Sequence, residues 1–307
     1  MSLRVLVTGS AGLVGTALRQ ALAAVGFEAV GMDLRESDHR ADVRDADAVA
    51  RAMEGCGGVV HLAAVSRVID GERDPERCRS TNVGGVKNVL GAARSSKLRP
   101  WVVFVSSREV YGEADSLPAS EDAALRPMNV YGRTKVAGEE LVGAARLDGL
   151  KACVVRLSNV FGSTLDHPDR VVPAFARGAV LGRTLRVDGE DHTFDFTHIS
   201  DVSRGLAALA LYLERESRPP PPIHFVTGTP TTLGELARLA IELGGNRSLM
   251  HLAPPRDFDV QRFFGDPARA RSLLGWSPEV PLRQGLEALM SAYARELQPA
   301  EVAESTG

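Results

Sequence analysis

Residues 3–15 read LRVLVTGSAGLVG, and this stretch decides the fold. The apolar run 3–7 predicts a buried strand that enters a turn with a glycine at every third position, and a helical pattern follows. In a strand–turn–helix unit of this kind the backbone approaches a pyrophosphate, and the helix N-terminus offers it free N–H groups. We therefore expect a dinucleotide to contact Gly9, Gly12, Leu13, Val14 and Gly15.

An acidic residue closes the second expected strand. The segment 27–32 reads FEAVGM and runs into Asp33. An acid at this distance from the glycine turn accepts hydrogen bonds from the adenosine ribose hydroxyls, which favours NAD over NADP. Arg35 lies two residues further on, so NADP stays open at this point.

Two later segments extend the expected cofactor site. Asp42 and Val43 precede a helix predicted over 46–53. They are interpreted either as contacts to the adenine or as an ordinary helix entry. The next strand ends at Leu62, Ala63 and Ala64, whose small size would let a cofactor lie flat above the sheet.

Strands and helices then alternate regularly. Strands expected at 101–105 and 152–157 are almost entirely apolar, and each is preceded by an expected helix, at 84–95 and 131–147. This pattern predicts an α/β protein with a Rossmann-type, doubly wound parallel sheet, whose ligand lies beyond the carboxyl ends of the strands.

The alternation loosens after Gly162, which predicts a smaller mixed α/β domain. Helices are expected there at 233–243 and 282–297. We assign residues 1–161 and 191–222 to an NAD-binding domain, and residues 162–190 and 223–307 to a substrate-binding domain.

The segment YGRTK places Tyr131 and Lys135 four residues apart, on one face of the expected helix. A free tyrosine titrates near pH ~10, and a nearby positive charge lowers this value, so the pair predicts a phenolic acid/base. The chain has only four tyrosines and four lysines. This spacing therefore arises by chance in roughly one such chain in twenty, and an ordinary surface helix is the alternative.

Bulk composition excludes several classes of function. The formal net charge is -3 and the arginines are dispersed, which argues against a nucleic-acid partner. Three widely spaced cysteines, Cys56, Cys78 and Cys153, indicate neither disulfides nor a metal site. No apolar run is long enough for a membrane span, and the N-terminal one ends at Thr8. The cytoplasm is the expected location.

Nine motifs in order resemble the extended short-chain dehydrogenase/reductase family, in its NAD-dependent epimerase/dehydratase branch. They cover nearly the whole chain: TGSAGLVG (8–15), DVRD (42–45), HLAA (61–64), TNVGGVKNVL (81–90), SSREVYG (106–112), YGRTK (131–135), RLSNVFG (156–162), FDFTHISDV (194–202) and LGWSPEVPLRQGL (274–286).

The resemblance implies specific roles for five residues. Tyr131 would be the catalytic acid/base, and Lys135 would lower its pKa and hold the nicotinamide ribose. Ser107 would hydrogen-bond the reacting sugar hydroxyl. Asn159 falls on the family asparagine that touches the substrate near its phosphates, whereas Asn82 is interpreted as structural.

The implied reaction is 4-epimerisation of a nucleotide sugar through a transient 4-keto intermediate, with NAD as the cofactor. A dehydratase or decarboxylase would need Glu109 for a second proton transfer. The usual dehydratase Asp-Glu pair is incomplete, because Arg108 occupies the Asp position. A reductase acting on a substrate without a nucleotide, and a non-catalytic NAD-sensing protein, are further alternatives.

The chain departs from this family in the expected substrate region. Asp188 stands in place of an aromatic residue, and Phe194 in place of an arginine that grips the diphosphate. Arg256 and Arg186 are candidate replacements, with Arg108 as a further substrate contact. By resemblance, the substrate is UDP- or dTDP-linked, and helices near 84–95 and 131–147 pair in a homodimer.

Overall fold

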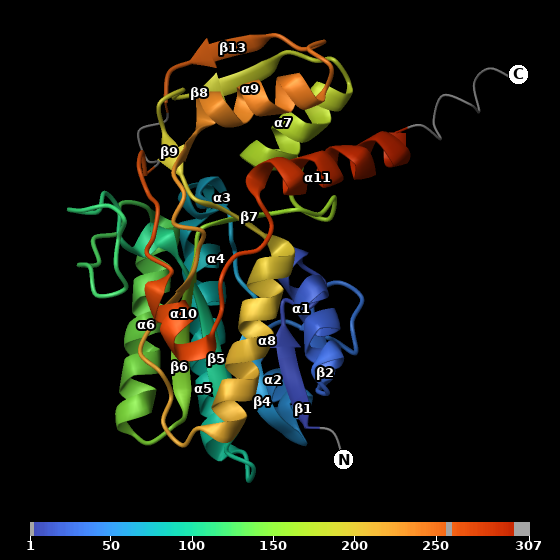
Figure 1. Cartoon of the computed structure of the whole chain (residues 1–307). Helices are drawn as coiled ribbons and strands as arrows, with labels where there is room; N and C mark the ends of the chain where they lie inside the picture. The colour runs from blue at the N-terminus through green and yellow to red at the C-terminus, as the bar shows by residue number, and fades with distance from the viewer. Residues whose placement is uncertain (1–2, 256–259, 298–307) are drawn as a thin grey trace, which may run out of the picture.

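A parallel seven-stranded sheet forms the larger part of the protein (Figure 1). The computed structural model describes residues 3–255 and 260–297. The strand order is β11-β6-β5-β4-β1-β2-β3, so the sheet grows outward in both directions from β1 and β4. Its strands are β1 (Arg4–Thr8), β2 (Glu28–Asp33), β3 (His39–Arg40), β4 (Cys56–His61), β5 (Trp101–Ser107), β6 (Ala152–Leu157) and β11 (Ile223–Phe225).

Helices cover both faces of this sheet, as the apolar strands predict. One layer contains α1 (Leu13–Ala24), α8 (Ile199–Arg215) and α10 (Ala268–Leu274), and the other contains α2 (Ala46–Met53), α5 (Gly85–Ser95) and α6 (Val130–Leu147). Along each strand, alternate side chains pack against one helix layer and then the other. In β5, Val103 and Val105 join the core under α1 and α8, whereas Val102 and Phe104 join the core under α5 and α6.

Short helices that were not predicted connect β4 to α5. They are α3 (Val68–Arg73), α4 (Pro75–Arg79) and the π-helical turn η1 (Ser80–Gly84). Within η1 the buried Asn82 accepts a hydrogen bond from the Val65 N–H (2.8 Å) and donates one to Thr134 Oγ1 (2.9 Å). The side chain therefore fastens the segment after β4 to α6.

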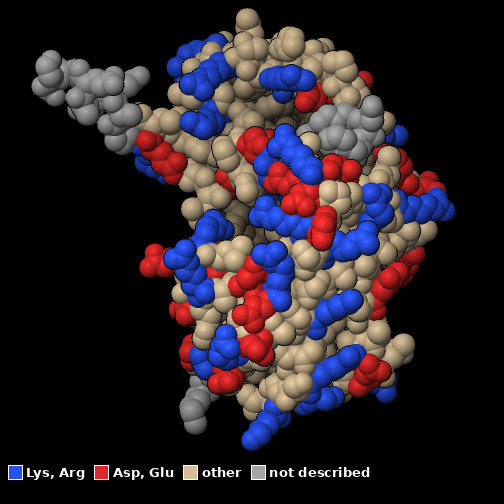
Figure 2. Space-filling model, turned by 180° about the vertical axis from the view of Figure 1, so that it is seen from behind, with Lys and Arg blue, Asp and Glu red and all other residues tan. Residues whose placement is uncertain are grey.

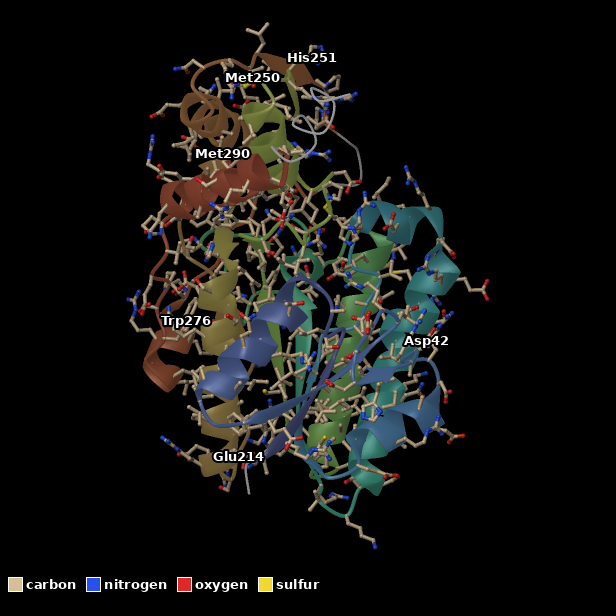
Figure 3. The ribbon with its side chains drawn as sticks, turned by 90° about the vertical axis from the view of Figure 1, so that its right-hand side faces the viewer. Asp42, Glu214, Met250, His251, Trp276 and Met290 are labelled. Atoms are coloured by element: carbon tan, nitrogen blue, oxygen red, sulfur yellow. The ribbon has the colours of Figure 1, made fainter. Side chains whose placement is uncertain are left out.

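A second hydrophobic core holds the smaller part of the molecule together. It is built from α7 (Val171–Val180), α9 (Leu233–Leu243), α11 (Leu282–Leu297) and β8 (Leu185–Asp188). Met290 of α11 lies in it, and Met250, which begins β13 (Met250–Ala253), packs against it (Figure 3). Three two-stranded sheets border it: β8 with β13, β9 (Thr193–Phe194) with β12 (Thr231–Thr232), and β7 (Asn159–Phe161) with β10 (Phe196–His198).

The division between the two parts differs from the predicted boundary at 222/223. β11 begins at Ile223, yet it pairs with β6 as the outermost strand of the large sheet. α10 and Trp276 also pack on that sheet, and the Trp276 indole N–H donates to the Asp201 carbonyl at 2.9 Å (Figure 3). Residues 223–225 and 268–276 therefore belong with the Rossmann core. The sheet to which so short a strand belongs is set by its partner, here β6.

A buried ion pair fastens α6 to β6, the strand next to the outermost one of the sheet. Arg156 of β6 makes two parallel hydrogen bonds to Glu139 of α6, at 2.9 and 2.6 Å. Arg156 Nη1 also donates to the Tyr111 hydroxyl oxygen (2.6 Å) and to the Glu121 carbonyl (2.7 Å). Both partners of the ion pair have almost no exposed surface. Their charges are therefore compensated only by each other and by these hydrogen bonds.

Glu139→Ala should lower the free energy of unfolding by about 3–5 kcal/mol, because it leaves the Arg156 charge buried without its partner. Urea unfolding measures the change. Glu140→Ala, at the neighbouring exposed position of the same helix, should stay within about 0.5 kcal/mol of the wild type. The double variant Glu139→Leu/Arg156→Met should recover most of the loss. A loss below about 1 kcal/mol for Glu139→Ala would contradict this account.

Candidate active site

One cavity of about 900 Å³ collects the predicted site residues at the carboxyl edge of the sheet. It runs from the glycine turn, past the ends of β4 and β5, to β8 and β9 of the smaller part. Every predicted site residue within the described ranges lines it: Gly9, Gly12, Leu13, Val14, Gly15, Asp33, Asp42, Val43, Leu62, Ala63, Ala64, Ser107, Arg108, Glu109, Tyr131, Lys135, Asn159 and Arg186. Arg256 lies outside the described residues.

The glycine turn has the shape that a dinucleotide requires. A Cβ on Gly15 would lie 2.2 Å from the Gly9 carbonyl oxygen, and a Cβ on Gly9 would lie 2.8 Å from the Ala63 nitrogen. Gly9 also has a φ of +72°, which few other residues adopt. No side chain caps the first turn of α1, which starts at Leu13 after Gly12. Its N–H groups therefore remain available for a pyrophosphate.

Asp33 stands beside this turn at the end of β2. Its carboxylate accepts from the Ala11 N–H (3.0 Å) and the Arg35 N–H (2.9 Å), and the Arg35 guanidinium lies 3.5 Å from it. Asp42 is further from the turn and is held by Arg44 through side-chain bonds of 2.9 and 2.6 Å. These bonds hold the pKa of Asp42 below its usual value. Both acids therefore border the adenosine end of the cavity.

Ser107, Tyr131 and Lys135 meet where β5 ends. Tyr131 and Lys135 are both buried in the first turns of α6, and the Ser107 hydroxyl is near enough to the phenol of Tyr131 to lower its pKa. The Lys135 ammonium donates to the Val105 carbonyl at 2.8 Å and lies 5.6 Å from the centre of the Tyr131 ring. The expected serine hydroxyl, phenol and ammonium therefore share one corner of the cavity.

The pKa of Tyr131 differs from the sequence-based expectation. Burial raises it to about 12, and the strongest opposing effects are the Arg170 guanidinium and the hydrogen bond to Ser107. Lys135 was expected to lower this pKa, but burial lowers the pKa of Lys135 itself to about 8. The positive charge that lowers the Tyr131 pKa most is therefore that of Arg170 and not that of Lys135.

Glu109 and Arg108 form a second polar unit beside this corner. Glu109 is buried, and its two oxygens take a hydrogen bond from Asn129 Nδ2 (2.6 Å) and an ion pair with Arg108 Nη2 (3.0 Å). Asn129 also caps α6, since its Oδ1 accepts from the Gly132 N–H at 2.8 Å. Asn129 was missed in the sequence, although an asparagine directly before a helix is a capping signal.

Arg170 and Arg186 line the cavity beside the smaller part of the molecule, and sequence patterns indicated only Arg186. Arg170 precedes α7, donates to Ser66 Oγ at 3.0 Å and acts on the Tyr131 phenol. Arg186 is largely exposed and paired with Asp188 at 2.7 Å. No motif marks Arg170, because it acts through a contact between distant parts of the chain.

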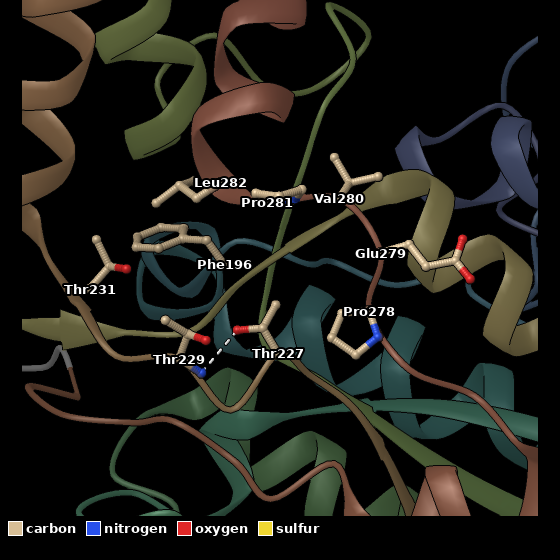
Figure 4. A pocket seen from close by; sticks show the side chains of 9 residues that line it. All are labelled: Phe196, Thr227, Thr229, Thr231, Pro278, Glu279, Val280, Pro281 and Leu282. Atoms are coloured by element: carbon tan, nitrogen blue, oxygen red, sulfur yellow. Dashed lines mark hydrogen bonds between the residues drawn. The ribbon is translucent and has the colours of Figure 1, made fainter.

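A second cavity, of about 280 Å³, contains none of the predicted residues (Figure 4). It lies between the threonines of the 227–231 loop and the segment 278–282 before α11. Thr227 Oγ1 accepts there from the Thr229 N–H at 3.1 Å and donates to the buried Asp195 carboxylate at 2.9 Å. The Thr227 hydroxyl is therefore already paired within the protein.

Other kinds of site find no support in the described part of the chain. Within residues 3–255 and 260–297, no three His, Cys, Asp or Glu side chains are grouped to hold a metal ion. None of the described helices is long and apolar enough to cross a bilayer. On the face drawn in Figure 2, basic and acidic side chains are interspersed.

Lys135→Met should change how the stability of the cofactor-free protein depends on pH. The pKa of Lys135 is about 8 in the folded state, against 10.5 for an unperturbed lysine. Between these values the unfolded chain binds more protons, so wild-type stability should rise with pH there. Relative to the variant, the rise should be about 3 kcal/mol. Urea unfolding across this pH range measures it.

The control for this experiment is Lys97→Met, which removes an exposed lysine and should follow the wild-type curve. Parallel pH curves for Lys135→Met and the wild type would show that Lys135 is not held in a buried, costly position.

Known proteins share both the sequence and the architecture of this site. Residues 5–228 match the NAD dependent epimerase/dehydratase family. A UDP-glucose 4-epimerase from Mycolicibacterium smegmatis is 31% identical, over 96% of this chain and all of the relative. UDP-glucuronic acid decarboxylase 1 from Danio rerio is 30% identical, over 96% of this chain and 73% of the relative.

A solved structure extends the likeness to three dimensions. The UDP-glucose 4-epimerase of Thermus thermophilus, in complex with NAD, superposes with a TM-score of 0.86 at 27% identity, covering 95% of this chain and 99% of that one. The glycine turn, Asp33 and the small residues after β4 fit that cofactor. The chain belongs to the NAD-dependent epimerase/dehydratase family, and NAD is its cofactor.

Proposed function

We propose that this protein is a nucleotide-sugar 4-epimerase in which Tyr131 is the acid/base. The observation that carries the proposal is the meeting of Ser107, Tyr131 and Lys135 in the cavity that also holds the glycine turn. A phenol beside a serine hydroxyl can exchange a proton with a carbinol oxygen placed between them. The same group can return that proton after the ketone turns its other face to the cofactor.

The residues around the phenol have proposed roles in binding the cofactor and in orienting the substrate. Bound NAD supplies the hydride acceptor and, at its nicotinamide, a positive charge that favours the phenolate. Lys135 is fixed on the Val105 carbonyl, where it can also donate to the nicotinamide ribose. Ser107 orients the reacting hydroxyl. Asn159 and Arg186, on the substrate side of the cavity, are proposed contacts for the nucleotide diphosphate.

Relatives support a UDP-linked substrate. The proteins reported above are named for UDP-glucose and UDP-glucuronic acid. We extend this class of substrate to the present chain as part of the proposal, with a dTDP-linked sugar as the alternative.

Glu109 is the residue on which the main alternative depends. A dehydratase or decarboxylase would use it for a second proton transfer, but both of its oxygens are held, by Asn129 and Arg108. A carboxylate bound in this way serves better to orient its neighbours than to exchange a proton. The arrangement therefore favours epimerisation, which needs only the phenol.

A homodimer in the cytoplasm completes the proposal. Gly91 of α5 and Gly143 of α6 are exposed, and an added Cβ on either would meet nothing within 4 Å. Leu147, near the end of α6, is 91% exposed. Small residues let helices approach closely, and an exposed leucine gains from being covered, so these faces suit the pairing of two copies.

Tyr131→Phe should lower kcat for interconversion of UDP-glucose and UDP-galactose by about 10²- to 10⁴-fold, because the proton has no acceptor. NAD binding should persist. Proton NMR of the sugar anomeric signals measures turnover, and absorbance at the NADH band measures release of reduced cofactor. Tyr212→Phe, a half-buried tyrosine of α8 outside the cavity, is the matched control.

Three outcomes would overturn this proposal. Full activity in Tyr131→Phe would remove the tyrosine from the reaction. Stoichiometric consumption of added NADH would identify a reductase. Loss of water or carbon dioxide from the substrate would identify a lyase that uses Glu109.

Light scattering of the purified protein should give twice the chain mass of 32.8 kDa. Gly143→Glu should shift it toward the monomer, because a charged side chain would separate the two helices. Ala294→Glu on α11 serves as a control on a different surface. A monomer in the wild type would contradict the pairing.

A further inference from the structure

We propose that Arg108 selects nucleotide sugars whose reacting sugar carries a carboxylate, so that the preferred substrate is a hexuronate rather than a neutral hexose. This inference rests on the proposed function and names the substrate class of the same site. Three observations support it: the surroundings of the Arg108 guanidinium, the place of Arg108 in the cavity and the aromatic ring on which the guanidinium stacks.

The guanidinium is held rigidly but lacks one partner. Its Nη2 is paired with Glu109 at 3.0 Å, and its central carbon lies 4.4 Å from the centre of the Phe194 ring. The Arg108 side chain is only 12% exposed. Its Nη1 is buried and has no hydrogen-bond partner among the described residues. A buried N–H without a partner is costly, so a ligand acceptor at this position is favoured.

Arg108 stands at the reacting end of the substrate. It follows Ser107 directly, and its ion-pair partner Glu109 is near enough to Tyr131 to affect the ionisation of the phenol. An anionic group that binds Arg108 would therefore be a substituent of the sugar ring that exchanges a proton with Tyr131. The nucleotide end would extend toward Arg186 and β8 instead.

A carboxylate suits this place in charge and shape. A planar guanidinium with free N–H groups binds carboxylates with directional, charge-assisted bonds that a sugar hydroxyl matches less well. Glu109 already balances the charge of Arg108, so a second carboxylate needs other cations. Lys135 and Arg170 line the same cavity and supply them.

Phe194 helps to hold the guanidinium in place. Its ring, on β9, forms a platform under the guanidinium, which reaches across from the segment after β5.

Binding to the NAD-loaded protein tests the inference independently of turnover. Isothermal titration of UDP-glucuronate, UDP-glucose and UDP should show that the wild type prefers the uronate. Arg108→Met should weaken uronate binding by about 10- to 100-fold and change the affinity for UDP less than about 3-fold. Arg108→Lys, which keeps the charge but loses the fork, should fall between. Arg283→Met, which removes an exposed arginine of α11, is the matched control.

The arms of the experiment separate the possible results. Equal weakening of all three ligands would place Arg108 on the diphosphate and overturn the inference. A wild type that binds UDP-glucose as tightly as UDP-glucuronate would also overturn it. Preference for the uronate without any epimerisation would support the role of Arg108 while refuting the proposed reaction. If Arg108→Met does not fold, Arg108→Lys decides the result by the same comparison.

Discussion

The active site depends on a buried salt bridge that does not touch the cavity. Arg156 and Glu139 join β6 to α6, and Glu139 stands one turn beyond Lys135 on that helix. A buried pair of this kind adds little net stability but is costly to break, so it specifies one position of the helix. Tyr131 and Lys135 keep their places beside β5 because α6 cannot slide or turn on the sheet.

The cavity itself works against stability. Burial disfavours the charged ammonium of Lys135, and Nη1 of the Arg108 guanidinium has no hydrogen-bond partner among the described residues. A folded chain tolerates such groups when the surrounding structure holds them in place. Here the Asn129 cap, the Glu109 carboxylate and the Phe194 ring do this. A bound cofactor and substrate would provide partners for the buried polar groups of Lys135, Tyr131 and Arg108.

Long elements with a clear period could be predicted from the sequence. The helices 46–53, 233–243 and 282–297 and the strand 152–157 have the predicted bounds. Each buries an apolar stripe or run that is recognisable without knowledge of its neighbours. The sheets to which two- and three-residue strands such as β9 and β11 belong could not be predicted. Their backbone bonds are made to strands far away in the sequence, as the pairing of β11 with β6 shows.

The sequence by itself determined the Rossmann sheet, the NAD site and the choice of Ser107, Tyr131 and Lys135 as candidates for the chemistry. These features depend on local signals: strand periodicity, glycine spacing and a four-residue interval on one helix. The tertiary structure alone decided which charges act on the phenol and where the substrate-side cation lies. The charge of Arg170 acts on Tyr131, and the Arg108 guanidinium stacks on Phe194, although the two residues of each pair are far apart in the sequence. Electrostatic effects depend on distance and burial in space, and residue spacing does not encode either of them.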